Sequence, residues 1–125
     1  MRDDPSKKPV GDSAIPSTDG PQQADLRVSP RYPFVAVAKV TDLSSGARSS
    51  ARTSDLSLGG CYIDTLNPFP VGSVVRLQLL TDKGCFEALA KVAYVHARIG
   101  MGLVFTEVAP AHQLVLDLWL TEIAK

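Results

Sequence analysis

Apolar and polar residues alternate in most segments of the chain after residue 33. Alternation with a period of two places successive side chains on opposite faces of a strand, so these segments predict strands with one buried face. Val75, Leu77 and Leu79 share one such face, whereas Arg76 and Gln78 lie on the other. We predict strands at residues 34–40, 61–65, 73–80, 86–96 and 99–105, and a second strand in or near the polar stretch 47–53.

The two last predicted strands carry further signals. Gly100 and Gly102, in the last strand, indicate a bulge or a close approach of the backbone. The predicted buried face of the strand before it comprises Phe86, Ala88, Ala90, Val92 and Tyr94.

Short turn signals separate the predicted strands. Residues 42–46 (DLSSG) and 82–84 (DKG) are rich in Asp, Ser and Gly, which favour tight turns. Strands that recur at intervals of roughly 8–14 residues with short turns are typical of a small antiparallel barrel. We therefore predict an all-β fold, a six-stranded antiparallel barrel.

The period of the pattern changes after Pro110, a residue that is favoured in the first turn of a helix. The apolar residues that recur with helical spacing are Leu114, Val115, Leu118, Trp119 and Ile123. Leu116 and Leu120 widen this stripe. We expect a short C-terminal α-helix that packs against the barrel mouth with Trp119 in the core. The width of the stripe leaves open a role in self-association or partner binding.

Residues 1–25 differ from the rest of the chain in composition. They contain only five apolar side chains among prolines, glycines and polar residues. Such a segment cannot bury enough apolar surface to offset the entropy lost on ordering. We interpret residues 1–25 as a flexible, disordered N-terminal tail and residues 26–125 as a single folded domain.

The charge balance and the hydropathy pattern exclude several partners. The 13 Lys and Arg residues match the 13 Asp and Glu residues, so the formal net charge is zero. A basic excess usually accompanies binding to nucleic-acid polymers or to anionic membranes, so we expect neither partner. No stretch approaches the roughly 18 apolar residues of a membrane span or resembles a secretory signal. We therefore expect no membrane insertion and a cytoplasmic protein.

The chain lacks the residue patterns of catalysis and of metal binding. Cys61 and Cys85 are too few for a disulfide framework or a zinc site, so we expect free, partly buried thiols. His96 and His112 have no Cys, Asp or Glu at metal-ligand spacing, so we expect surface or turn histidines. We predict no enzymatic activity, no metal and no cofactor.

Two short motifs remain. Arg27 and Arg31 form an RxxxR segment just before the first predicted strand. Asp55, Ser57 and Gly60 form a DxSxxG segment at the predicted turn between the second and third strands. Asp55 follows Arg31 by 24 residues.

In this order, and followed by this strand pattern, the two motifs resemble those of the PilZ domain family of cyclic di-GMP receptors. The segments GGCYI, PFPVG and GMGLVF also look like the family, and the resemblance covers roughly residues 25–122. It implies a PilZ-type six-stranded barrel with a C-terminal helix, and a non-catalytic receptor. The ligand contacts that it implies are Arg27, Arg31, Asp55, Ser57 and Gly60.

These residue types suit a ligand with two phosphates and two guanines. An arginine fork can bind the O6/N7 edge of guanine, hold a phosphate or stack on the purine. Asp55 can accept the N1–H and N2–H₂ donors of guanine, and Ser57 offers a small hydroxyl to phosphate or base. Gly60 lets the backbone approach the ligand without a Cβ.

The residues that flank the motifs modify this picture. We expect the Arg27–Arg31 segment to act as an arm that closes over the ligand, and Pro30 and Pro33 stiffen it. Gly59, Arg52 and Arg48 are further candidate ligand contacts; the alternative for the two arginines is solvated charge on a strand.

The leading hypothesis is a receptor that couples cyclic di-GMP to protein–protein signalling in bacteria, through an unidentified downstream protein. We expect a monomer or a weak homodimer, and the sequence leaves open whether one cyclic di-GMP or an intercalated dimer binds. The alternative is a PilZ-like adaptor with weak or no nucleotide binding. A barrel for single-stranded nucleic acid would need basic grooves with exposed aromatics, and aromatic residues make up only 6% of the chain.

Overall fold

The computed structural model describes residues 30–124. The predicted tail (1–25) and the predicted ligand contact Arg27 lie outside the described residues. The elements are β1 (Tyr32–Asp42), β2 (Arg48–Leu56), β3 (Gly60–Asp64), β4 (Val74–Thr81), β5 (Gly84–His96), β6 (Gly100–Glu107) and α2 (Pro110–Ile123).

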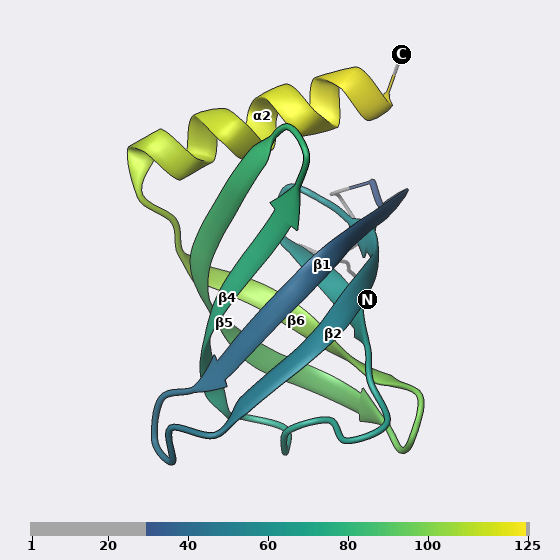
Figure 1. Ribbon diagram of the computed structural model, residues 1–125, viewed down its shortest axis with the longest axis vertical. Coiled ribbons are helices and arrows are strands. Elements are labelled where there is room, and N and C mark those ends of the chain that lie inside the picture. The colour runs from purple at the N-terminus through teal and green to yellow at the C-terminus, as the bar shows by residue number, and fades with distance from the viewer. Residues whose placement is uncertain (1–29, 125) are drawn as a thin grey trace, which may run out of the picture. The chain divides into compact units, whose positions relative to one another are not determined.

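The six strands form a closed barrel in the order β1-β2-β3-β6-β5-β4 (Figure 1). Every neighbouring pair is antiparallel, and β1 closes the barrel by pairing with both β2 and β4. Closure gives each strand a hydrogen-bonded neighbour on both sides, so the sheet has no free edge. The predicted six-stranded antiparallel barrel with a C-terminal helix is confirmed.

The barrel interior is filled by alternate side chains of the strands. In β4, Val75, Leu77 and Leu79 are fully buried, as the alternation predicts, while Arg76 points to solvent. Phe86, on β5, is the largest side chain that is fully buried. A six-stranded barrel is narrow enough for such side chains to fill it, so the interior is core and offers no ligand cavity.

The predicted buried face of β5 is wrong at one position. The pairing of β5 with β6 shifts between Val92 and Tyr94, which marks a bulge. Val92 is buried and Val95, three residues on, packs against the core, so Tyr94 lies on the outer face. An even strand would keep a spacing of two between inward side chains, and the extra residue of the bulge reverses the alternation.

The helix α2 lies across one end of the barrel (Figure 1). Its buried residues are Leu116 and Trp119, and the Trp119 ring packs on Phe34, with 5.3 Å between ring centroids. The prediction of Trp119 in the core is therefore confirmed. The predicted stripe is wrong at Leu114 and Leu118, which are 64% and 65% exposed and point away from the barrel. No helix in residues 30–124 is long and apolar enough to span a membrane.

His112 is not a simple surface histidine. The pairing between β5 and β6 ends at Leu89, so the backbone N–H of Glu87 has no partner on β6. His112 accepts a hydrogen bond from this N–H at its Nδ1, with 3.1 Å between the nitrogens. The histidine thus satisfies a strand donor from the first turn of α2, and its ring also meets the edge of Phe86.

We expect replacement of Trp119 by alanine to detach α2 from the barrel. Trp119 contacts Phe34 and Phe86, and truncation of a buried aromatic side chain costs about 3–5 kcal/mol. Urea unfolding followed by circular dichroism measures this loss. Leu118→Ala is the matched control on the exposed face of the same helix, and we expect a change below about 0.5 kcal/mol. Equal losses in both variants would contradict the assignment of the buried face.

Candidate functional site

The pairing of β1 with β2 brings the second arginine of RxxxR to the aspartate of DxSxxG. Pro33 pairs with Asp55, so Arg31 lies just before β1, at the end of β2. The Arg31 guanidinium faces the Asp55 carboxylate with its fork, at 3.5 Å from Nε to Oδ2 and 3.4 Å from Nη2 to Oδ1. Both side chains are about one-third exposed. The two motifs, 24 residues apart in sequence, therefore meet at one point on the barrel surface.

A bulge in β2 turns Asp55 outward. Thr53 and Leu56 are both fully buried, and the register with β3 shifts between Thr53 and Asp55. The extra residue lets two inward side chains lie three positions apart, which leaves Asp55 on the outside. The buried Thr53 hydroxyl lies 2.8 Å from the Tyr62 carbonyl oxygen and 3.0 Å from that of Asp55, so its single hydrogen is shared between them and stabilises this distortion. Asp55 is the second-last residue of β2, so it lies in the strand and not in the predicted turn.

Ser57 shapes the turn that follows. Its buried Oγ accepts hydrogen bonds from the backbone N–H groups of Gly59 and Gly60, at 3.3 and 3.1 Å. The Ser57 hydroxyl also lies 3.1 Å from the Gly60 carbonyl oxygen. The hydroxyl is therefore used within the turn, and its expected contact with phosphate or base stays a prediction.

The close approach of β6 leaves no room for a side chain at Gly60. It pairs with Val104 on β6, and a Cβ at this position would overlap the carbonyl oxygen of Leu103. The adjacent Gly59 accepts a hydrogen bond from the Phe105 N–H at 2.9 Å, which ties the turn to β6. The missing side chain thus serves packing between strands, beside any role at a ligand.

Three aromatic rings, of which the first lies next to Asp55, were missed by the sequence reasoning. Asp55 pairs with Tyr62, and Tyr62 and Tyr94 both pair with Gly102, one from each side of β6. The ring centroids of Tyr62 and Tyr94 are 6.2 Å apart, and the Tyr62 hydroxyl lies 2.9 Å from Nδ1 of His96. We call Tyr62, Tyr94 and His96 the aromatic cluster.

Glycines on β6 make room for the aromatic cluster. A Cβ at Gly102 would overlap the Tyr94 ring, and a Cβ at Gly100 would overlap the Tyr62 ring. The close approach predicted at these glycines is therefore confirmed, and it involves side chains as well as backbone. The glycines were the available signal, because a glycine within a strand often accommodates an aromatic ring from a neighbouring strand.

The surroundings of the aromatic cluster change the pKa of Tyr62. Partial burial raises the pKa of Tyr62, and the neighbouring Tyr94 hydroxyl raises it further. The carboxylates of Asp64 and Asp55 act in the same direction. The Tyr62 hydroxyl therefore stays protonated at neutral pH.

The structure separates the two additional arginines. Arg52 pairs with Asp64 across β2 and β3 and binds its carboxylate at 3.1 Å, so its charge is matched close to the motif. Arg48 pairs with Thr41 at the opposite end of β2. The seven residue steps from Arg48 to Asp55 span about 23 Å of strand. Arg48 is thus not brought to the two motifs.

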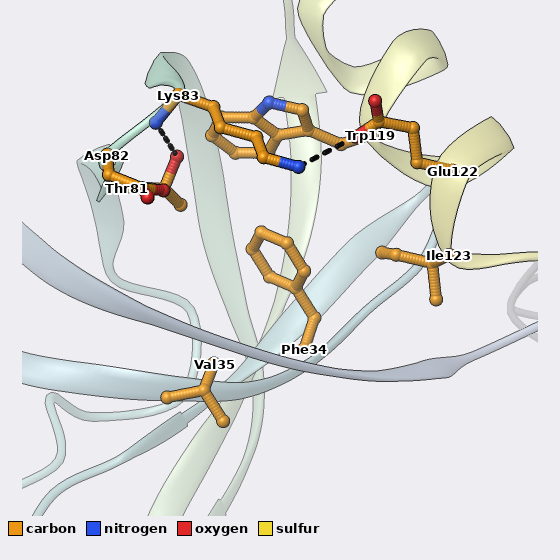
Figure 2. A pocket seen from close by; sticks show the side chains of 8 residues that line it. All are labelled: Phe34, Val35, Thr81, Asp82, Lys83, Trp119, Glu122 and Ile123. Atoms are coloured by element: carbon orange, nitrogen blue, oxygen red, sulfur yellow. Dashed lines mark hydrogen bonds and ion pairs between the residues drawn. The ribbon is translucent and has the colours of Figure 1, made fainter.

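A hollow under α2 contains none of the predicted ligand residues. It has a volume of about 300 Å³, and Phe34 and Trp119 are among the residues that line it (Figure 2). Lys83 and Glu122 form an ion pair at its rim, at 3.6 Å, and Ile123 adds an apolar wall. The hollow is a gap beneath the docked helix. Phe34, which lines it, follows Arg31 by three residues in the sequence.

The described residues offer no metal centre. Within residues 30–124, no group of three or more His, Cys, Asp or Glu side chains could hold a metal ion. Both cysteines are free, and Cys61 is completely buried. Burial raises the pKa of the Cys61 thiol to about 12, although the hydrogen bond with Thr53 opposes the shift.

We expect the two thiols to react at very different rates. At pH 8 the Cys61 thiol is protonated and inaccessible, whereas Cys85 is partly exposed, although burial and Glu87 raise its pKa. Titration of the folded protein with Ellman's reagent should modify one thiol rapidly, and both in denaturant. The Cys85→Ser variant should show no rapid phase when folded. Rapid modification of two thiols in the folded protein would contradict the burial of Cys61.

Comparisons with known proteins agree with this geometry. The family model of the PilZ domain matches residues 25–122. No curated protein matches the chain. Among solved structures, the PilZ domain of CeSA from a cellulose-synthesizing bacterium has a TM-score of 0.63 at 16% identity, and the match covers 78% of this chain and 100% of that one.

Two further solved structures share the fold. The PilZ domain of YcgR from Escherichia coli, solved with c-di-GMP, has a TM-score of 0.62 at 17% identity, over 77% of this chain and 89% of that one. The inhibitor of motility MotI/DgrA from Bacillus subtilis has a TM-score of 0.65 at 17% identity, over 75% of this chain. The match covers 49% of MotI/DgrA, so this chain corresponds to about half of that protein.

Proposed function

The chain belongs to the PilZ domain family, and on that basis we propose that it is a cytoplasmic receptor for cyclic di-GMP. The receptor has no catalytic activity and passes the signal to a downstream protein. The observation that carries the proposal is the meeting of Arg31 and Asp55 on the barrel surface. The c-di-GMP-bound PilZ domain of YcgR, which shares the fold, supports it.

The chemistry of Arg31 and Asp55 suits a guanine nucleotide. The carboxylate accepts the two adjacent N–H donors of a guanine edge, and the guanidinium holds O6 and N7 or a phosphate. In the structure these two groups bind each other. An ion pair between partly exposed groups contributes only about 0–1 kcal/mol, so a ligand can replace it at low cost. The pair therefore keeps both groups in place until the ligand arrives.

The aromatic cluster adds a surface on which a purine can stack. Tyr62 lies beside Asp55 in the register of β2 and β3, and Tyr94 extends the surface across β6. Stacking of a base on an aromatic side chain contributes about 1–3 kcal/mol. A guanine held at its edge by Asp55 thus has a ring next to it, and the chain combines charge, an edge acceptor and a stacking surface.

The arm would complete the site. Arg27, with its fork, lies four residues before Arg31 and outside the described residues. We infer that the segment from residue 26 closes over the ligand, so that the domain extends over residues 26–125 and the tail precedes it. Pro30 and Pro33 limit the conformations of the segment between them and favour extended backbone.

The output of the receptor would be a contact with another protein. The outer face of α2 presents Leu114 and Leu118, both about two-thirds exposed, and this observation favours the adaptor as the second candidate function. An adaptor would use the same helix face without the nucleotide. A monomer that docks a partner and a weak homodimer both fit this face.

Calorimetric titration tests the proposed function. We expect saturable binding of cyclic di-GMP by the full chain at micromolar protein. Binding of cyclic di-AMP should be much weaker because Asp55 selects the guanine edge, and binding of GTP should be much weaker because it offers one guanine instead of two. The adaptor predicts no heat with any of the three nucleotides. Absence of heat with cyclic di-GMP would therefore reject the receptor and leave the adaptor.

Arg31→Ala should weaken the binding of cyclic di-GMP by about 2–3 kcal/mol, roughly a 30–100-fold loss, as for a bidentate charged contact. The matched control is Arg48→Ala on the same barrel face, because Arg48 lies remote from Asp55; it should change the affinity less than about twofold. A loss below about threefold for Arg31→Ala, in a variant that melts like the parent, would show that Arg31 does not hold the ligand.

A further inference from the structure

Three cationic side chains gather on the outer face of the barrel, away from the two motifs. Thr41 on β1 pairs with Arg48 on β2 and with Arg76 on β4, so an arginine stands on either side of it. Neighbouring strands are about 4.8 Å apart, which places the two arginine Cα atoms about 10 Å from each other. Lys39 lies two residues along β1 on the same face, about 7–8 Å diagonally from each arginine.

These side chains surround a hollow of about 650 Å³. Its remaining lining is mostly made of hydroxyl and amide groups, contributed by Thr41, Ser49, Ser50 and Gln78. The hollow has the size of a small-molecule site, and no acidic residue lines it. Arginine forks, a lysine ammonium and hydroxyl donors are the groups with which proteins bind phosphate.

The acidic residues closest to the hollow lie outside its lining and accept hydrogen bonds of their own, and Glu87 and Glu107 line a neighbouring hollow with Arg76. Asp42, next to Thr41, accepts hydrogen bonds from Ser44 and Ser45 in the following turn. Glu87, across β4, accepts a hydrogen bond from Gln78 at 2.8 Å.

The cations of the hollow differ from the other arginines described. Among residues 30–124, no carboxylate lies within 4.0 Å of Lys39, Arg48 or Arg76. In contrast, Arg31 and Arg52 each form an ion pair with an aspartate. Like charges that converge repel one another, and a bound anion relieves the repulsion.

We propose that the hollow among Lys39, Arg48 and Arg76 is a second ligand site, which binds a small molecule that carries a phosphate or pyrophosphate group. The site is distinct from the proposed cyclic di-GMP site, because Arg48 and Asp55 lie about 23 Å apart along β2. Its concave, hydroxyl-rich lining favours a soluble phosphorylated compound over the flat surface of a membrane.

Titration of the full chain with inorganic pyrophosphate, at constant ionic strength and followed by NMR of backbone amides, tests the proposal. We expect saturable shifts centred on Thr41, Arg48 and Arg76, with little change at Asp55. Absence of saturation up to millimolar pyrophosphate, or shifts centred on Arg31 and Asp55 instead, would overturn it. Sedimentation with vesicles that contain phosphatidic acid is the second arm. Binding to these vesicles without binding of pyrophosphate would also overturn it.

A variant separates the site from general charge effects. The double variant Arg48→Gln and Arg76→Gln should weaken pyrophosphate binding at least about tenfold, because both forks are lost. Lys91→Gln removes an exposed cation from β5, outside the hollow, and should change the affinity less than about twofold. Equal weakening by Lys91→Gln would show attraction to net charge alone. All three positions are exposed, so we expect each variant to fold like the parent. Thermal melting checks this.

Discussion

Closure of the barrel is the constraint on which the other features depend. β1 must pair with β2 on one side and with β4 on the other, and the narrow interior accepts one set of alternate side chains. Polar side chains are therefore left on the outer face, where the pairing of strands decides which of them become neighbours. Arg31 and Asp55 meet for this reason, and so do Lys39, Arg48 and Arg76, which lie on three adjacent strands.

Two irregularities in the barrel act on the same strip of surface. One bulge lies between Thr53 and Asp55 on β2, and the other lies between Val92 and Tyr94 on β5. Each inserts one residue, so that Asp55 and Tyr94 turn outward on either side of Tyr62. Local distortions in strand pairing thus place the Asp55 carboxylate and the Tyr94 ring on the outer face. The PilZ family match spans all the strands that carry this strip.

The C-terminal helix completes the barrel where strand pairing ends. The pairing with β6 begins only at Leu89, so the first residues of β5 have no partner there. His112 supplies the acceptor that the backbone N–H of Glu87 would otherwise lack. Trp119 then covers the open end of the interior by packing on Phe34. Because these inward contacts determine how α2 rotates about its axis, Leu118 faces solvent although it belongs to the apolar stripe. An exposed apolar face next to the N-terminal end of β1 is a consequence of this docking.

The sequence by itself determined the elements, the turns and the two motifs, because alternation, helical periodicity and turn propensity depend on residues close in the chain. It predicted the barrel, the buried Trp119 and the close approach at Gly102 correctly. Only the tertiary structure decided that Arg48 lies far from Asp55 and that Tyr94 faces outward. Register and bulges are properties of paired strands, and one inserted residue reverses every side chain beyond it. The local pattern of a single strand carries no information on that pairing.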